Sequence, residues 1–430
     1  MKTLRILIGR HYGFNSIHYT SMVLDNLLPI LKTKFNVKII WFFYMPEKID
    51  EKIINDPNVE ILDIHDFNNC VEVIKKSKPD LVIENEFPSL IDIALNTAAK
   101  YFKIPVIIKI LAIDSAKLSK KRILTSFIPT FFHSKMPFEL SEKKQFMRRG
   151  RFFLYKYKFL LKTLNALHLN FLTILKYFFL TFKWHLFYHA PYLDSRFAGD
   201  LHYLESEKFL DIMIRKGYSK ESIVVTGSPV YDNIFKKYKN VETVQNKELK
   251  TRILFAPIQY YEGGLWTKKE RDDTIKSIIK QLSKHKDEFS LVVKLHPSSQ
   301  LYSDYEKIIH EEDPSIPIFQ KGVLADFLDT TDLIISFSPI GGSLIFPLIA
   351  HKPVVLCNFF NFKYANPIEK DVAWECINPE NLIETIRTAK TANNSRIIDN
   401  YLNKIMYKTD GCSSERLCNA IESLVKKFNP

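Results

Sequence analysis

The sequence predicts an α/β protein with two Rossmann-like, doubly wound domains and a helical insertion in the N-terminal half. Three observations predict it. The chain has 430 residues, which is more than one hydrophobic core usually supports. Two series of short, β-branched apolar segments alternate with segments of helical periodicity, as in parallel sheets with helical crossovers. Between the two series lies a basic, aromatic stretch without a strand-and-turn rhythm.

The first series occupies the N-terminal third and returns once after the insertion. Its segments are rich in Val and Ile and almost continuously apolar, as expected of parallel strands buried on both faces. Between them, Thr20–Leu31 and Pro88–Tyr101 have apolar residues at helical spacing. The predicted strands are Leu4–Ile8, Val37–Phe43, Val59–Leu62, Leu81–Ile83, Val106–Ile110 and Ile223–Val225.

The second series follows the charged stretch Phe235–Lys250, whose composition is typical of an interdomain linker. Lys268–Lys284 and Ile340–Ala350 are predicted helices, and a last helix with one apolar face begins near Ser413. The predicted strands are Ile253–Ala256, Leu291–Lys294, Ile318–Phe319, Leu333–Ser336 and Val354–Cys357. The predicted units are an N-terminal domain over 1–234, a C-terminal domain over 251–410 and a C-terminal helix over 411–430.

Residues 117–190 are predicted to form the helical insertion. From Lys143 to Leu193 the chain has ten Lys or Arg and no Asp or Glu, interleaved with Phe, Tyr and Trp. The best window for a membrane span, Thr163–Phe182, contains two Asn, one His and one Lys, so we do not expect it to cross a bilayer. Two interpretations stay open: contact with an anionic membrane surface, or a helical subdomain with an aromatic core and solvated basic residues.

Composition narrows the choice of partner and compartment. The net charge of +13 predicts a negatively charged partner, such as a nucleotide-type substrate or an anionic membrane. No nucleic-acid-binding module accompanies the charge, so we expect no nucleic acid partner. The first apolar run is short and ends at Gly9-Arg10-His11, as a strand does and a signal peptide does not. The five cysteines are scattered, which predicts a reduced, cytoplasmic protein without a metal site.

The loops that follow the second series of strands carry the residues best suited to bind an anion, because ligands of parallel sheets bind at the carboxyl ends of the strands. One loop runs from Ser336 to Ser343 and leads into a predicted helix. Gly341-Gly342 allows backbone amides to approach a diphosphate, and the helix N-terminus adds positive potential. A tight turn that needs Gly only for its geometry is the competing interpretation.

A second loop at the same predicted edge is Lys294-Leu295-His296-Pro297-Ser298. Pro297 keeps the preceding residue extended, which presents the His296 imidazole where it can donate to a phosphate oxygen. Lys294 lies close by and can neutralise charge on a departing nucleotide. The competing interpretation is a surface histidine packed on a proline.

Taken in their order along the chain, these two loops and three further segments resemble a superfamily of two-domain proteins of the glycosyltransferase-B type. It includes surface-polysaccharide glycosyltransferases, sialyl- and Kdo-transferases, CDP-glycerol glycerophosphotransferases and non-hydrolysing UDP-GlcNAc 2-epimerases. Val292–Pro297 resembles their His-Pro motif, and Asp332–Pro353 resembles their nucleotide loop and the strand after it. Three further segments are similar to parts of these proteins. The end of their first domain resembles Ile223–Asp232, the start of their second domain resembles Leu254–Pro257, and the start of their C-terminal helix resembles Asp410–Arg416.

The resemblance implies a nucleotide-activated sugar, UDP-, CMP- or CDP-linked, bound by the C-terminal domain and an acceptor bound by the N-terminal domain. It also implies that neither a metal nor a tightly bound cofactor is obligatory. The resemblance carries over His296, Ser338, Gly341, Gly342 and Ser343 as phosphate contacts. The whole predicted donor site comprises Lys294, His296, Ser298, Ser336, Ser338, Gly341, Gly342 and Ser343.

The chain departs from this pattern at two places. The relatives usually have an Arg just after the strand that ends near Pro257, where this chain has Gln259-Tyr260. The epimerases hold the ribose with acidic residues one turn into the helix after Gly-Gly, where this chain has Ile345 and Phe346. Neither side chain can accept a hydrogen bond from a ribose hydroxyl, which argues against an epimerase and leaves the nucleotide base open.

A transferase also needs a base for the acceptor hydroxyl. Glu84 and Glu86 follow an N-terminal strand, and we expect them to face the cleft, where partial desolvation would raise the pKa of a carboxylate. Asp114 is the rival, and His18 is predicted to orient phosphate or acceptor. A solvated loop position is the alternative for each of these residues.

The sequence therefore predicts a metal-independent glycosyltransferase that builds a cell-surface polysaccharide or glycolipid, in the cytoplasm or on the inner face of the cell membrane. Glu86 or Glu84 would activate the acceptor, while His296 and the Ser338–Ser343 loop would stabilise the leaving nucleotide. One alternative keeps the fold but transfers a polyol phosphate or epimerises a sugar. Another is a non-catalytic glycan- or membrane-binding protein.

Overall fold

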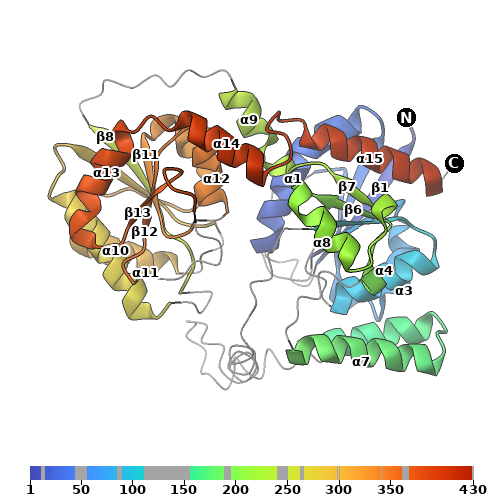
Figure 1. The fold of residues 1–430 in the computed structure, drawn as a ribbon. Coiled ribbons are helices and arrows are strands. Elements are labelled where there is room, and N and C mark those ends of the chain that lie inside the picture. Colours follow the sequence, from blue (N-terminus) through green and yellow to red (C-terminus); the bar gives the residue numbers. More distant parts are fainter. Residues whose placement is uncertain are drawn as a thin grey trace.

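The computed structural model describes residues 1–10, 15–43, 56–84, 90–110, 155–187, 195–239, 250–261, 266–297, 299, 301–339, 341–360 and 368–428. Within these ranges the chain forms two units, each a parallel sheet with helices on both faces (Figure 1). The predicted doubly wound α/β fold is confirmed. Glu86, Asp114 and Ser298 lie outside the described residues, as do residues 117–154 of the insertion.

Sheet A, of the N-terminal unit, has seven strands in the order β3-β2-β1-β4-β5-β6-β7, and all its pairs are parallel. Strand β1 lies inside the sheet, β2 and β3 are added on one side of it, and the chain then crosses over to β4 on the other side. Six strands lie where the sequence predicted them, and β6 was not predicted. The strands are β1 (Thr3–Arg10), β2 (Asn36–Phe43), β3 (Val59–Asp63), β4 (Leu81–Glu84), β5 (Val106–Ile110), β6 (Leu201–Leu204) and β7 (Ile223–Val225).

Sheet B, of the C-terminal unit, has six strands in the order β10-β9-β8-β11-β12-β13, again all parallel. Five of them were predicted, and the short edge strand β13 was not. The strands are β8 (Thr251–Ala256), β9 (Phe289–Lys294), β10 (Ile318–Phe319), β11 (Leu333–Ser336), β12 (Val354–Cys357) and β13 (Trp374–Cys376).

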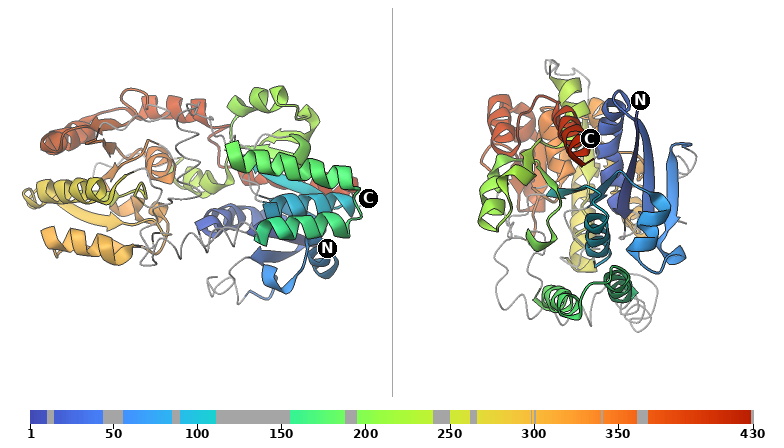
Figure 2. Two further views of the ribbon diagram at one scale, coloured as in Figure 1. Left: turned by 90° about the horizontal axis from the view of Figure 1, so that it is seen from below. Right: turned by 90° about the vertical axis from the view of Figure 1, so that its right-hand side faces the viewer.

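Two hydrophobic cores cover the faces of sheet A. One contains side chains from α3, α4, helical residues 155–166 and α7, which places the described part of the insertion against the N-terminal unit (Figure 2). The other contains side chains from α1 and from α15, the last helix of the chain. The helices of this unit are α1 (Asn15–Lys32), α3 (Cys70–Ser77), α4 (Leu90–Tyr101), α7 (Phe171–Phe187), α8 (Leu210–Arg215), α9 (Asp232–Tyr238) and α15 (Ser413–Phe428).

Sheet B is also covered on both faces, and one of its cores extends into the N-terminal unit. Helices α10, α11 and α13 pack on one face. On the other face, α12 and α14 share a core with Val23 of α1 and with Val230 and Ile234, next to and within α9. The helices are α10 (Lys268–Ser283), α11 (Tyr302–Glu312), α12 (Gly342–Ile349), α13 (Leu382–Thr391) and α14 (Ser395–Ile405).

The two units therefore meet beside the carboxyl ends of their strands. Helix α12 begins just after β11, and α1 begins just after β1, so both start at a carboxyl edge. The Phe346 ring of α12 packs edge-on against Tyr231, with 5.2 Å between the ring centroids. In a parallel sheet this edge is where ligands bind, so the fold places the predicted donor site next to the other unit.

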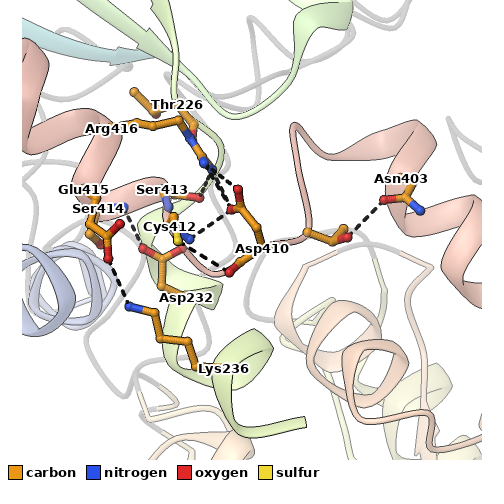
Figure 3. A network of polar contacts seen from close by, with 11 residues as sticks. Thr226, Asp232, Lys236, Asn403, Asp410, Cys412, Ser413, Ser414, Glu415 and Arg416 are labelled. Carbon is orange, nitrogen blue, oxygen red and sulfur yellow. Dashed lines mark hydrogen bonds and ion pairs between the residues drawn. The ribbon is translucent and has the colours of Figure 1, made fainter. Parts of the chain in front are cut away.

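A network of polar contacts holds the chain where it crosses back from the C-terminal unit to α15 (Figure 3). The buried carboxylate of Asp232 accepts hydrogen bonds from the backbone amides of Ser413 (3.0 Å) and Ser414 (2.6 Å), the first two residues of α15. Arg416 donates from Nε to the carbonyl oxygen of Thr226 (2.7 Å) and pairs with the Asp410 carboxylate (2.8 Å). We call Thr226, Asp232, Asp410 and Arg416 the crossing network.

Two glycines allow the crossing segments to approach each other this closely. Gly227 has a φ of +82°, and a Cβ there would lie 2.5 Å from Ser413 Oγ and 2.8 Å from the carbonyl oxygen of Tyr407. Gly411 has a φ of +70°, and its Cβ would lie 2.9 Å from the carbonyl oxygen of Asp232. Both positions combine a left-handed backbone with contact to the main chain, so only glycine fits without strain.

Replacing Asp232 by Ala is expected to destabilise the protein, because it leaves two buried amides and a helix N-terminus without an acceptor. The loss should be about 2–4 kcal/mol, visible as a thermal midpoint several degrees below that of the wild type. Asp211→Ala is the matched control, since Asp211 is an exposed residue in the first turn of α8. Equal midpoints for the two variants would contradict the role given to Asp232.

Candidate active site

The carboxyl edge of sheet B carries the loops that follow β8, β9, β11 and β12. Ser336 is the last residue of β11 and Ser338 lies in the loop after it, and both are buried. Helix α12 begins at Gly342. Gly341 has a φ of +79°, and a Cβ there would meet no atom of the described residues within 4 Å. Gly342 is required for packing, because a Cβ there would lie 2.9 Å from the Phe346 ring.

Two hydroxyl groups, one on each side of this loop, are buried without a hydrogen-bond partner among the described residues. They are Ser336 Oγ, at the end of β11, and Ser343 Oγ, in the first turn of α12. Leaving a buried hydroxyl unpaired costs about 1–3 kcal/mol, so such groups call for an explanation. The helix N-terminus beside them favours an anion, whose oxygen atoms could accept from both hydroxyls.

An aromatic cluster adjoins the same loop. The Trp266 ring lies 5.2 Å from Tyr260, 5.0 Å from Phe337 and 6.1 Å from Phe360, centroid to centroid. Burial raises the pKa of Tyr260, and a hydrogen bond with Ser338 partly opposes that rise. Trp266 Nε1 is a third buried polar atom without a partner among the described residues. The sequence reasoning missed Trp266, although a lone Trp in a loop after a strand end was a usable signal.

Lys294 is placed differently from its predicted role. Its side chain is buried at the end of β9, and Nζ donates to the carbonyl oxygens of Leu295 (2.8 Å) and Gln320 (2.9 Å). Burial lowers the pKa of this ammonium group to about 8, and the negative charge of Asp326 limits that fall. Lys294 thus ties the loop after β9 to the loop after β10, and the expectation that it contacts the donor is not supported by this placement.

His296 lies two residues further on and is exposed, as the sequence predicted. Its carbonyl oxygen accepts from the amide of Ser299 (2.9 Å), which turns the chain immediately after Pro297. The backbone is therefore held on both sides of His296, by Lys294 before it and by Ser299 after it. An exposed imidazole on a fixed backbone at this edge is suited to donate to a ligand.

The predicted base Glu84 does not face a cleft. It is 2 % exposed, and its side chain accepts a hydrogen bond from Asn96 of α4 (3.4 Å). Burial, together with the nearby charge of Asp92, raises the pKa of Glu84 well above its usual value. The expectation was wrong because alternation along β4 directs Glu84 to the same face as Val82, under α4. His18 lies in α1 instead of a loop, and its side chain is outside the described part.

The carboxyl edge of sheet A carries an ion pair that the sequence reasoning missed. Lys109, in β5, pairs with Glu205, the residue after β6, at 3.0 Å. Ser228 Oγ donates to the same carboxylate (2.6 Å), and the Glu205 backbone carbonyl accepts from the amide of Tyr407 (3.1 Å). A prediction of β6 would have revealed Glu205, since it follows the strand directly.

Ile345 and Phe346, which stand where the epimerases have acidic residues, are both buried between the two units. Phe346 contacts Tyr231, whose pKa is raised by burial and by the charge of Glu205.

Among the described residues, no group of three or more His, Cys, Asp or Glu side chains lies together in a way that could hold a metal ion.

Solved structures of UDP-N-acetylglucosamine 2-epimerases match almost the whole chain. The enzyme from Methanocaldococcus jannaschii has a TM-score of 0.54 at 14% identity, over 98% of this chain and 99% of that one. The enzyme from Neisseria meningitidis, bound to UDP-GlcNAc, has a TM-score of 0.52 at 16% identity, over 99% and 100%. The S. aureus MnaA–UDP structure has a TM-score of 0.54 at 15% identity, over 99% and 97%.

The fold is of the glycosyltransferase-B type. The glycosyltransferase-B fold accounts for both sheets, the return of the last helix to the first unit and the position of the loop after β11. At these identities the likeness concerns the fold alone. No protein-family model matches the sequence, and a search of curated proteins finds no match.

The pKa of Lys294 predicts a pH dependence of stability. Between pH 8 and about 10.4 the unfolded chain still binds a proton that folded Lys294 has released, so this group makes the free energy of unfolding rise with pH. The thermal midpoint of the wild type relative to Lys294→Met should therefore increase from pH 8 to pH 10. The control is Lys280→Met, an exposed lysine of α10. A difference for Lys294→Met that stays constant over this range would contradict the burial of a charged group.

Proposed function

We propose that this protein transfers a sugar from a nucleotide-linked donor to a hydroxyl group of a cell-surface polysaccharide or glycolipid. The observation that carries the proposal is a pair of buried hydroxyls beside the N-terminus of α12, Ser336 Oγ and Ser343 Oγ, for which the described part of the chain supplies no hydrogen-bond partner. A diphosphate supplies several acceptor oxygens and two or more negative charges, which suit these donors and the helix N-terminus. Among the described residues, no atom lies within 4 Å of where a Cβ of Gly341 would be.

UDP is the nucleotide that the comparisons favour for the donor. Two of the structures that share the fold contain UDP or UDP-GlcNAc. In this chain, the aromatic cluster around Trp266 and the exposed His296 border the same edge as the two hydroxyls. We propose that His296 donates to the diphosphate and that Lys294 acts indirectly, by fixing the backbone on which His296 stands.

In the proposed reaction an acceptor oxygen attacks the anomeric carbon of the sugar. The bond from this carbon to the diphosphate oxygen breaks as the new glycosidic bond forms, and the acceptor proton passes to a carboxylate. Charge that develops on the diphosphate is stabilised by His296, the two hydroxyls and the amides at the start of α12. Because Glu84 is buried, we assign the base to Glu86, its neighbour outside the described residues.

A 2-epimerase is the second candidate, because structures with the same fold include UDP-GlcNAc 2-epimerases. The burial of Ile345 and Phe346 between the two units opposes it, since the positions that would hold a ribose carry apolar side chains in a hydrophobic core. The two reactions differ in an observable way. An epimerase converts UDP-GlcNAc without any acceptor, whereas a transferase releases UDP only when an acceptor or water takes the sugar.

The double variant Ser336→Ala/Ser343→Ala should weaken UDP binding at least tenfold without lowering the thermal midpoint. Hydrogen bonds to a charged group contribute about 1.5–3 kcal/mol each, while an unpartnered buried hydroxyl gives the folded protein nothing. Binding is measured by calorimetry. Ser77→Ala is the matched control, because Ser77 Oγ is buried and donates to the carbonyl oxygen of Val73 (2.7 Å), so the opposite pattern is expected. Unchanged UDP binding in the double variant would exclude these hydroxyls from the site.

Activity is tested with UDP-, CMP- and CDP-linked donors in two steps. Thermal shift identifies the donor, since a ligand at a hundred times its Kd stabilises by about 2.7 kcal/mol. Nucleotide release is then followed with a glycolipid extract as acceptor. His296→Ala should lower the rate about 100-fold and leave the midpoint unchanged. His65→Ala, at an exposed histidine of the N-terminal unit, is the control and should leave the rate unchanged. Stabilisation by a CDP-linked polyol would favour polyol-phosphate transfer, and binding of none of the donors would contradict an enzymatic role.

A further inference from the structure

Helix α7 of the insertion exposes large apolar side chains along one side. Phe171 is 73% exposed, Leu172 is 75% exposed and Phe179 is 60% exposed. Leu175 and Phe178 are more than a third exposed. We call these five residues the α7 stripe. A single exposed apolar residue is normal on a protein surface, but a contiguous set marks a site of interaction.

The stripe is a continuous surface because of the helical repeat. Successive residues turn about 100° around a helix, so positions 171, 175, 178, 179 and 172 fall within one arc of about 120°. The opposite side of α7 packs on the N-terminal unit. Tyr177 lies 5.6 Å from the Phe197 ring, and Thr181 is fully buried and bonded to the Tyr157 hydroxyl (2.6 Å). The orientation of α7 is thus fixed, with the stripe directed away from the protein.

Basic residues accompany the stripe. Lys176 is exposed on α7 itself, about 40° beyond Leu172 around the helix. Lys158 and Lys162 are exposed on the helix that precedes α7, and Lys162 Nζ donates to Asn68 Oδ1 (2.9 Å). In sequence the whole region from Lys143 to Leu193 contains ten Lys or Arg and no Asp or Glu. Two copies of this surface would repel each other, so a second copy of the chain is a poor occupant. A partner surface that is apolar at its centre and negatively charged around it is complementary to the α7 stripe and its basic residues.

An anionic lipid bilayer has this character, with an apolar interior below negatively charged headgroups. Among the described helices, none combines the length and the apolar composition that crossing a bilayer requires. Aromatic and leucine side chains next to lysines are typical of helices that lie flat in the interface. In Figure 1 and in the right-hand view of Figure 2, α7 and its neighbouring helix lie at the lower edge of the N-terminal unit.

We propose that the α7 stripe docks this protein on an anionic membrane surface. Phe171, Leu172 and Phe179 enter the boundary between headgroups and acyl chains, and the lysines contact the headgroup phosphates. This inference does not rest on the proposed function.

The test is sedimentation of the full-length protein with vesicles of phosphatidylcholine alone or mixed equally with phosphatidylglycerol. The wild type should bind the mixed vesicles, bind neutral vesicles much less, and lose affinity as salt is raised. Phe171→Ser/Leu172→Ser/Phe179→Ser should lower the affinity for mixed vesicles at least tenfold. Lys176→Gln should lower it about fivefold, as expected for one lysine near an anionic surface.

The matched control is Ile377→Ser/Ile397→Ser, which removes two exposed apolar side chains from the C-terminal unit and should leave vesicle binding unchanged. The thermal midpoint and the affinity for UDP are measured for every variant, so that loss of the nucleotide site is separated from loss of membrane docking. Failure of the wild type to bind mixed vesicles, or full binding by the triple variant, would overturn the proposal. So would a wild type that dimerises through the stripe without binding vesicles.

Discussion

One buried carboxylate ties together the segments with which the chain leaves the N-terminal unit and returns to it. Asp232 lies where the chain leaves sheet A, and it holds the first two amides of the helix with which the chain returns. Its negative charge is stabilised by those amides and by the positive end of α15. Departing and returning segments are thereby tied at one point, beside the core that α12 shares with α1.

Most of the fold was predictable because buried parallel strands are β-branched and apolar regardless of what surrounds them. The boundaries of β5, β10, β11 and β12 agree with the prediction to the residue. The strands β6 and β13 were not predicted, because they are only four and three residues long and because His202 and Glu375 interrupt their apolar pattern. His202 packs inside the protein, where burial lowers its pKa to about 4 and keeps the ring neutral. Such a residue reads as polar in a sequence although it belongs to the core.

The sequence was enough to predict which loops form the candidate site, but not the direction of each side chain in it. Strand ends located the loops of His296 and Ser336, since parallel topology fixes which ends share an edge. The direction of each side chain depends on pleat and packing, and the structure buries both Glu84 and Lys294, which were expected to face the ligand. Both are charged residues at the last position of a strand, which a sequence cannot distinguish from loop residues. The unpartnered hydroxyls of Ser336 and Ser343 could be recognised only in three dimensions.

Because α15 supplies Leu417, Ile421 and Leu424 to the core that covers α1, the first unit to be synthesised is the last to be completed. At typical elongation rates of about 5–20 residues per second, roughly 10–40 seconds separate the emergence of sheet A from that of α15. During this interval α1 can pack on the strands of sheet A, but the part of its apolar surface that α15 covers has no partner.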